Sequence, residues 1–207
     1  MVTPSARSLD LSSHDSVAVI AFARSGYPRL TQALLRELQD LLGEIQVGGL
    51  FRGVVIAANA RSFATGAAID EVATLDATSG RAFSDLGQKV FNQIAFYPMP
   101  VVAAIRGYCL GGGFDLALAC HARVATPDSC LGYPGGILGL ITGWGGTQRL
   151  PRLIGKAAAL EVFLTGERIP ATQAYTLGVI DELVSPDDLI EAAVRRASRL
   201  TARPAKL

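Results

Sequence analysis

Cysteine is scarce in this chain, and charges of the two signs nearly cancel. The three cysteines, Cys109, Cys120 and Cys130, match no metal-ligand spacing, and an odd number does not suit a disulfide framework. We therefore expect no metal site, and reduced thiols packed as small apolar side chains in the cytoplasm. The 19 basic and 18 acidic residues leave a net charge of +1, which gives no reason to expect nucleic acid or an anionic membrane as a partner.

The sequence also shows no pattern typical of a secretory signal or of a membrane-spanning helix. The opening MVTPSARSLDLSSHD has no apolar core. Residues 129–148 carry no charge, but they contain Pro134 and several glycines, which would break a spanning helix. We predict a buried glycine-rich loop system over this stretch.

Apolar residues make up 50% of the chain, enough for one globular domain over residues 1–207. Strands are predicted at 16–23, 53–59 and 101–107, which are apolar and rich in β-branched residues. Leucines at helical spacing predict a helix over 31–45, capped by Thr31. The other predicted elements are a loop entering a short helix at 62–72, a glycine-rich turn opening a helix at 111–122, a strand and turn at 123–128, and helices at 79–97, 156–164, 171–176 and 186–200. This alternation indicates an α/β fold.

Two predicted strands are followed by a turn and a helix start. VVIAAN runs into ARSFATGAAIDE, and VVAAI runs into RGYCLGGGFDLALAC. A helix N-terminus leaves backbone N–H groups free, and glycines let another group approach the backbone. Two such ends that face each other would stabilise a developing oxyanion. Each segment alone is equally typical of a tight structural turn.

Together with LGLITGWGGTQRLPRLIGKAAALEVFLTGERIPATQAYTLGVIDELV, these segments resemble the crotonase superfamily, the enoyl-CoA hydratase/isomerase family, in order and spacing. The resemblance covers nearly the whole chain. It implies a spiral of ββα units with short C-terminal helices, an acyl-CoA thioester as ligand, and no cofactor beyond the coenzyme A of the substrate. It also places the two oxyanion-hole donors on the backbone N–H groups of Ala67 and Gly112.

Two positions depart from the hydratase pattern, in which a pair of glutamates flanks the attacking water. Asp115 stands at the first, and Gly135, in PGGILG, at the second. The dienoyl-CoA isomerase branch shares the aspartate but keeps the second glutamate. The dihydroxynaphthoyl-CoA synthase branch shares the glycine but lacks the acid, so neither branch matches fully. Asp115 is interpreted either as a catalytic carboxylate or as an ordinary acid in the first turn of a helix.

The remaining candidates concern the ligand. Tyr133 is a candidate for the acyl pocket or a structural tyrosine, His121 is interpreted as structural or solvent-facing, and His14 as exposed in a polar turn. The alanine Ala68 stands where the family usually has aspartate. The predicted substrate-binding residues are Arg24, Phe63, Ala64, Ile69, Tyr133 and Pro134, with Arg61, Arg149, Arg152 and Lys156 as alternative phosphate ligands or solvated surface charges.

Family members usually continue with a helical segment that covers the site and packs against other subunits, whereas residues 185–207 supply only the start of one. A homotrimer or hexamer is the expectation from the resemblance. Three functions stay open: an enoyl-CoA hydratase/isomerase-like lyase of fatty acid metabolism, another crotonase-type enzyme such as a decarboxylase or thioester hydrolase, and a non-catalytic acyl-CoA-binding protein. The residues do not specify the acyl chain.

Overall fold

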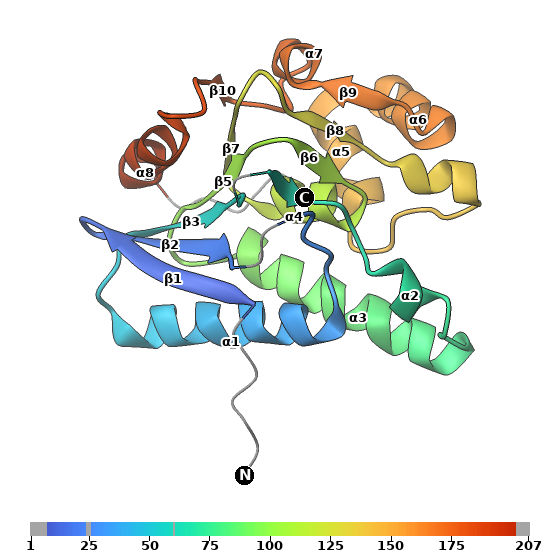
Figure 1. Ribbon diagram of the computed structural model, residues 1–207, viewed down its shortest axis with the longest axis horizontal. Helices are drawn as coiled ribbons and strands as arrows, with labels where there is room; N and C mark the ends of the chain where they lie inside the picture. The colour runs from blue at the N-terminus through green and yellow to red at the C-terminus, as the bar shows by residue number, and fades with distance from the viewer. Residues whose placement is uncertain (1–7, 24–25, 60, 202–207) are drawn as a thin grey trace.

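The computed structural model describes residues 8–23, 26–59 and 61–201, which fold around two sheets (Figure 1). The larger sheet has the order β1-β2-β3-β5-β7-β10, and all its neighbours are parallel except β1 and β2. Its strands are Leu9–His14 (β1), Val17–Phe22 (β2), Gly53–Ala57 (β3), Val101–Ile105 (β5), Ala122–Ala125 (β7) and Glu182–Leu183 (β10).

The second sheet has the order β4-β6-β8-β9. Each of β3, β5 and β7 is followed by one strand of this sheet and then by a helix, so the chain makes successive ββα turns. This arrangement confirms the predicted α/β spiral. The strands are Ser62–Ala64 (β4), Tyr108–Leu110 (β6), Cys130–Gly132 (β8) and Arg168–Pro170 (β9).

Helices cover both sheets. The side chain of Thr31 accepts a hydrogen bond from Leu34 N at 3.1 Å, which confirms the predicted cap of the first helix. The helices are Gln32–Gly48 (α1), Ile69–Val72 (α2), Ala77–Ala95 (α3), Gly112–Ala119 (α4), Gly146–Ile154 (α5), Lys156–Thr165 (α6), Ala171–Thr176 (α7) and Leu189–Arg199 (α8), with a 3-10 helix at Pro134–Leu138 (η1).

The central strands β3, β5 and β7 of the larger sheet are buried on both faces, as the continuous apolar runs predict, whereas the edge strand β1 is mostly exposed. Along β3, Val54 and Ile56 face the core that α1 and α3 cover, whereas Val55 and Ala57 face α8. Figure 1 shows α8 and α1 on opposite sides of this sheet. The central strands that lead into the turns described below are therefore packed on both faces.

Two expectations about loops were wrong. His14 is exposed, as expected, but it is the last residue of β1 and not part of a turn; the turn after it is made by Asp15, whose φ is 51°. The glycine-rich stretch is not buried throughout, because Ile137 and Ile141 are 77% and 75% exposed. Within the described residues, no helix is long and apolar enough to cross a membrane.

Candidate active site

Two glycine turns meet where the strands of the second sheet end. β4 and β6 are parallel neighbours, so the turns after them lie together. Gly66 adopts φ 102°, and a Cβ on it would lie 3.1 Å from Leu110 O and 3.3 Å from Gly112 N. A Cβ built on Gly112 would lie 3.5 Å from Ala67 N. Glycine at position 66 thus permits both the backbone conformation and the close approach of the two turns.

The backbone N–H groups of Ala67 and Gly112 donate no hydrogen bond to any described residue. Leu30 N donates to Gly66 O at 2.8 Å, and Leu30 O accepts from Ala68 N at 3.3 Å. Leu30 thus bonds to the residues on either side of Ala67 and leaves the Ala67 N–H free. Gly112 is the first residue of α4, where an N–H has no partner within its helix. Two free donors from different elements therefore lie close together.

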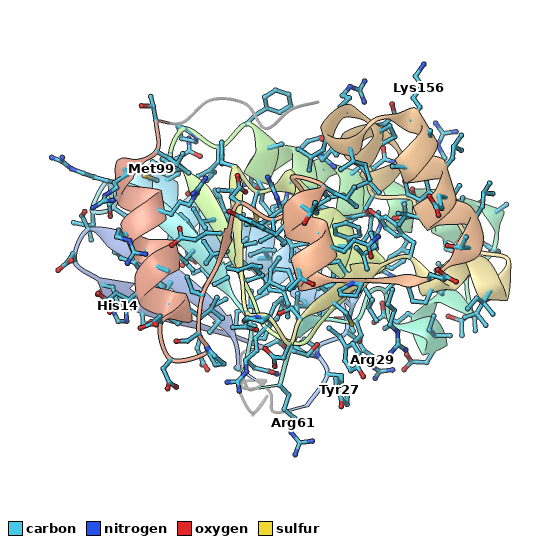
Figure 2. The ribbon with its side chains drawn as sticks, turned by 90° about the horizontal axis from the view of Figure 1, so that it is seen from above. His14, Tyr27, Arg29, Arg61, Met99 and Lys156 are labelled. Atoms are coloured by element: carbon cyan, nitrogen blue, oxygen red, sulfur yellow. The ribbon has the colours of Figure 1, made fainter. Side chains whose placement is uncertain are left out.

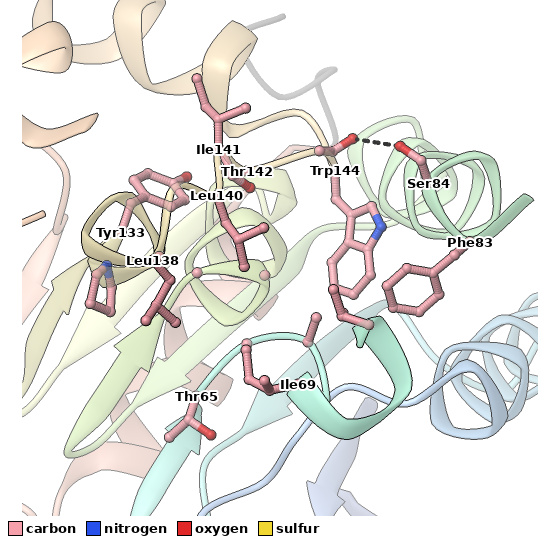
Figure 3. A pocket seen from close by; sticks show the side chains of 18 residues that line it. Thr65, Ile69, Phe83, Ser84, Tyr133, Leu138, Leu140, Ile141, Thr142 and Trp144 are labelled. Carbon is pink, nitrogen blue, oxygen red and sulfur yellow. Dashed lines mark hydrogen bonds between the residues drawn. The ribbon is translucent and has the colours of Figure 1, made fainter. Parts of the chain in front are cut away.

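Both donors line a cavity of about 330 Å³, seen from close by in Figure 3. Its wall comes from α2, α3, the turns described above and the loop that runs from β8 to α5. None of the described residues on this wall carries a carboxylate, imidazole or amine. The lining residues are Thr65, Gly66, Ala67, Ile69, Val72, Phe83, Ser84, Gly111, Gly112, Tyr133, Pro134, Gly135, Leu138, Leu140, Ile141, Thr142, Gly143 and Trp144.

Trp144 forms the wall beside the Gly112 donor. A Cβ on either Gly87 or Gly112 would overlap the indole, so the ring lies between helices α3 and α4. Phe83 and Phe91 contact it in edge-on geometry, with ring centroids 5.1 and 5.6 Å away. The indole is thereby held rigidly against the backbone that carries one of the free N–H groups.

Asp115 lies behind the cavity wall and is fully buried. Its carboxylate accepts hydrogen bonds from Tyr133 Oη at 2.7 Å, from Trp144 N at 3.1 Å and from the Thr142 hydroxyl. Burial raises the pKa of Asp115 although these hydrogen bonds oppose the shift. All three donors come from one segment, so Asp115 fastens the loop between β8 and α5 to helix α4.

The predicted substrate residues divide into two groups. Ile69, Tyr133 and Pro134 line the cavity, as does Gly135. Phe63 and Ala64 are fully buried and lie outside the wall; Phe63 packs edge-on against Phe22 with ring centroids 5.9 Å apart. The structure therefore does not bring these two, or Asp115, into the cavity lining.

The candidate phosphate ligands lie apart from one another. Arg149 is only 3% exposed and donates to Trp144 O and Asn92 Oδ1, so its interpretation as a solvated surface charge was wrong. Arg61 and Lys156 project from opposite sides of the molecule (Figure 2). Arg152 is exposed and donates to Gln148 O. Arg24 lies outside the described residues.

His121 has a structural role, as one of its two interpretations held. Its Nδ1 accepts a hydrogen bond from Val101 N at 2.9 Å, and burial lowers the pKa of the ring. All three cysteines are free, with Cys109 and Cys120 buried. The described residues contain no cluster of three or more potential metal ligands.

The family model for enoyl-CoA hydratase/isomerase matches residues 12–207. The chain belongs to the enoyl-CoA hydratase/isomerase family. It is 43% identical over 174 residues to the fatty acid oxidation complex subunit alpha of Shewanella halifaxensis, covering 82% of this chain and 24% of that protein. The chain therefore spans about a quarter of the length of the curated relatives it matches.

Solved structures of this family have the same fold. The enoyl-CoA hydratase of Bacillus anthracis is 34% identical with a TM-score of 0.88, covering 93% of this chain and 76% of that one. An enoyl-CoA hydratase subunit from Geobacillus kaustophilus is 33% identical with a TM-score of 0.86, covering 96% and 77%. The crotonase fold expected from the sequence motifs is thus confirmed.

Sequence reasoning missed much of the cavity wall. Trp144, Phe83 and the apolar loop residues Leu138, Leu140 and Ile141 all line it. The one tryptophan of the chain, placed among the glycines of GLITGWGG, was an available signal, because a large ring among small residues often packs against backbone. Phe83 lies in a different helix and has no comparable local signal.

Proposed function

We propose that this chain is an acyl-CoA-processing enzyme of the enoyl-CoA hydratase/isomerase type, in which the N–H groups of Ala67 and Gly112 polarise the thioester carbonyl. The observation that carries the proposal is the pair of unused backbone donors at the edge of an apolar cavity. Negative charge that develops on the thioester oxygen would be stabilised there, and apolar walls strengthen that interaction.

The rest of the cavity suits an acyl chain. Ile69, Val72, Phe83 and Leu138 give it apolar walls, and we assign Tyr133 and Pro134 to the substrate-binding wall as well. The hydroxyls of Thr65 and Ser84 donate to backbone oxygens, so they do not compete for the carbonyl. The polarised thioester would then reach an enolate-like state.

The proposal is tested by binding an aromatic enoyl-CoA, whose absorption band moves to longer wavelength when its carbonyl is polarised. The protein should produce this shift. Ala67→Pro removes one donor that makes no hydrogen bond in the fold, so it should reduce both the shift and, by about 100-fold or more, kcat/KM. Ala67→Ser keeps the N–H and serves as the control. Binding without a shift would contradict the proposal.

A second reaction class is favoured by one observation. No carboxylate lies on the described cavity wall, and Gly135, which the family resemblance matches to the second hydratase glutamate, is part of that wall. Decarboxylation and thioester hydrolysis need the polarised carbonyl but no glutamate pair. A panel of malonyl-, enoyl- and 3-hydroxyacyl-CoA thioesters separates these classes, and a spectral shift without turnover of any of them would indicate a binding protein. Assembly as a homotrimer or hexamer remains a prediction.

A further inference from the structure

Two hydroxyl groups on the cavity wall are directed at one buried carboxylate. Tyr133 and Thr142 both line the cavity, and both donate to Asp115. Figure 3 shows their hydroxyl ends turned toward each other. A hydroxyl has one hydrogen and two lone pairs, so each group keeps acceptor capacity after it has donated to the carboxylate. Either hydroxyl can therefore accept a proton from a molecule in the cavity, although the Asp115 carboxylate does not line the cavity itself.

We propose that Asp115 exchanges protons with the substrate through Tyr133, so that one carboxylate and one phenol do the work of the two glutamates. This inference rests on the proposed polarisation of the thioester by Ala67 and Gly112. Tyr133 is then the catalytic residue, and Asp115 acts through it as a positioning residue.

Tyr133 suits this role better than Thr142. Its ring contacts those of Phe114 and Phe163, with centroids 5.0 Å apart in each pair, which fixes the phenol. Burial and the neighbouring Asp115 raise the pKa of the Tyr133 phenol above its ordinary value, but a phenol is still a stronger acid than the aliphatic alcohol of Thr142. Thr142 lies instead on an exposed part of the loop, since Ile141, the residue before it, is 75% exposed. The better-held and more acidic hydroxyl is the better proton carrier.

Nearby groups stabilise the ionised form of the Asp115 carboxyl. A Cβ on Gly146 would overlap both Tyr133 Oη and Asp115 Oδ1, so the pair lies against the first residue of α5. The N-terminal end of a helix favours negative charge. Arg149 lowers the pKa of Asp115, and burial, which has the larger effect, raises it.

Hydration of an enoyl thioester by this relay takes place in two halves. Water oxygen bonds to the β-carbon of an enoyl thioester, and the π electrons move to the thioester oxygen. The water proton passes to Tyr133 Oη while the phenol proton passes to Asp115 Oδ1. In the second half, the enolate α-carbon takes a proton from Tyr133, and the Asp115 proton returns to Tyr133. One water has been added, and both residues are restored.

Tyr133→Phe is the decisive variant because it removes only the hydroxyl. Crotonyl-CoA hydration and exchange of the α-hydrogens of butyryl-CoA into D2O should each fall about 100-fold or more, while the spectral shift of a bound aromatic enoyl-CoA persists. Tyr97→Phe is the matched control: it also removes a buried hydroxyl, which donates to Leu42 O at 2.6 Å, but far from the cavity wall. It should lower stability and leave both rates unchanged.

Two further variants complete the test. Asp115→Asn should abolish the rise of kcat/KM with pH that deprotonation of the carboxyl produces in the wild type, an effect that a purely structural role would not give. Thr142→Val should reduce the rates less than Tyr133→Phe. A smaller loss in Tyr133→Phe than in Thr142→Val, or a wild type that shows the spectral shift but neither hydrates nor exchanges, overturns the relay. Absence of the shift in the wild type contradicts the proposed function instead.

Discussion

The resemblance to the family matches Gly135 and Asp115 to the two glutamates of hydratase members, and the structure places these two residues at different depths. Gly135 lies on the cavity wall, whereas Asp115 is buried behind it. The φ of Gly135 lies outside the left-handed region, and a Cβ on it would make ordinary contacts of 3.5 Å with Leu140. A side chain at position 135 would therefore reach the cavity without backbone strain.

We predict that Gly135→Glu increases hydration of crotonyl-CoA by about 10-fold or more, because it adds a second carboxylate that can activate water directly. The rate is followed by loss of the enoyl absorbance. Gly135→Gln has nearly the same shape without the acid, so it should give no increase. Equal rates in the two variants would show that water activation does not depend on a carboxylate at this position.

At the residue scale, the depth of Asp115 was the feature that the sequence could not predict. The resemblance to the family assigns the donor role to Ala67 N and Gly112 N, and that role stays a prediction. The depth of Asp115 depends on partners such as Tyr133 and Trp144, which lie 18 and 29 residues away. No local pattern reveals which way such a carboxylate turns.

Helix α3 contributes a glycine that matters more than its propensity suggests. Gly87 faces the indole of Trp144, which fills the place a Cβ would need. Gly80 lies earlier in the same helix, where a Cβ would have only Leu75 Cβ nearby, at 4.0 Å. The same substitution should therefore have opposite effects at two positions of one helix.

Gly87→Ala should lower the free energy of unfolding by about 1–3 kcal/mol, because the added methyl group overpacks the contact and displaces Trp144. Gly80→Ala should raise it by about 0.5–1 kcal/mol through helix propensity. Urea titrations measure both. The packing argument fails if the two variants change stability in the same direction.

At the element scale, the longer strands and most helices were predictable from apolar runs and caps. The three-residue strands β4, β6 and β8 were not, because each is defined by pairing with a neighbour distant in sequence. Helix α5 was missed because it begins at Gly146 and contains Pro151, which both usually mark loops.

Across the whole molecule, an ion pair between buried Arg123 and partly buried Asp181 ties the C-terminal part to the larger sheet. The guanidinium of Arg123, on β7, donates to Val179 O at 2.6 Å and to Asp181 Oδ2 at 3.0 Å. Asp181 also accepts from Arg123 N and pairs with Arg196 of α8. These contacts hold the segment that leads into β10 and α8.

Asp181→Ala should lower the free energy of unfolding by about 2 kcal/mol, because it leaves the Arg123 guanidinium buried without its carboxylate. Asp85→Ala is the matched control, since Asp85 pairs with Arg81 on an exposed helix face and should change stability little. Thermal unfolding compares them. A loss as large in the control would show that burial of the pair is not the cause.

At this scale the resemblance of the sequence motifs to the crotonase superfamily predicted the spiral fold and the family correctly. The exposure of residues 136–141 could not be predicted, since an uncharged run reads as buried until its neighbours are known.

The position of Trp144 has a practical consequence. It is the one tryptophan of the chain, and its indole lines the cavity beside Gly112. Intrinsic fluorescence of the protein should therefore come mainly from the proposed acyl site, and its intensity or emission wavelength should change as that site fills. Occupancy can be titrated in the unlabelled wild-type protein, even with thioesters that absorb no visible light and undergo no reaction.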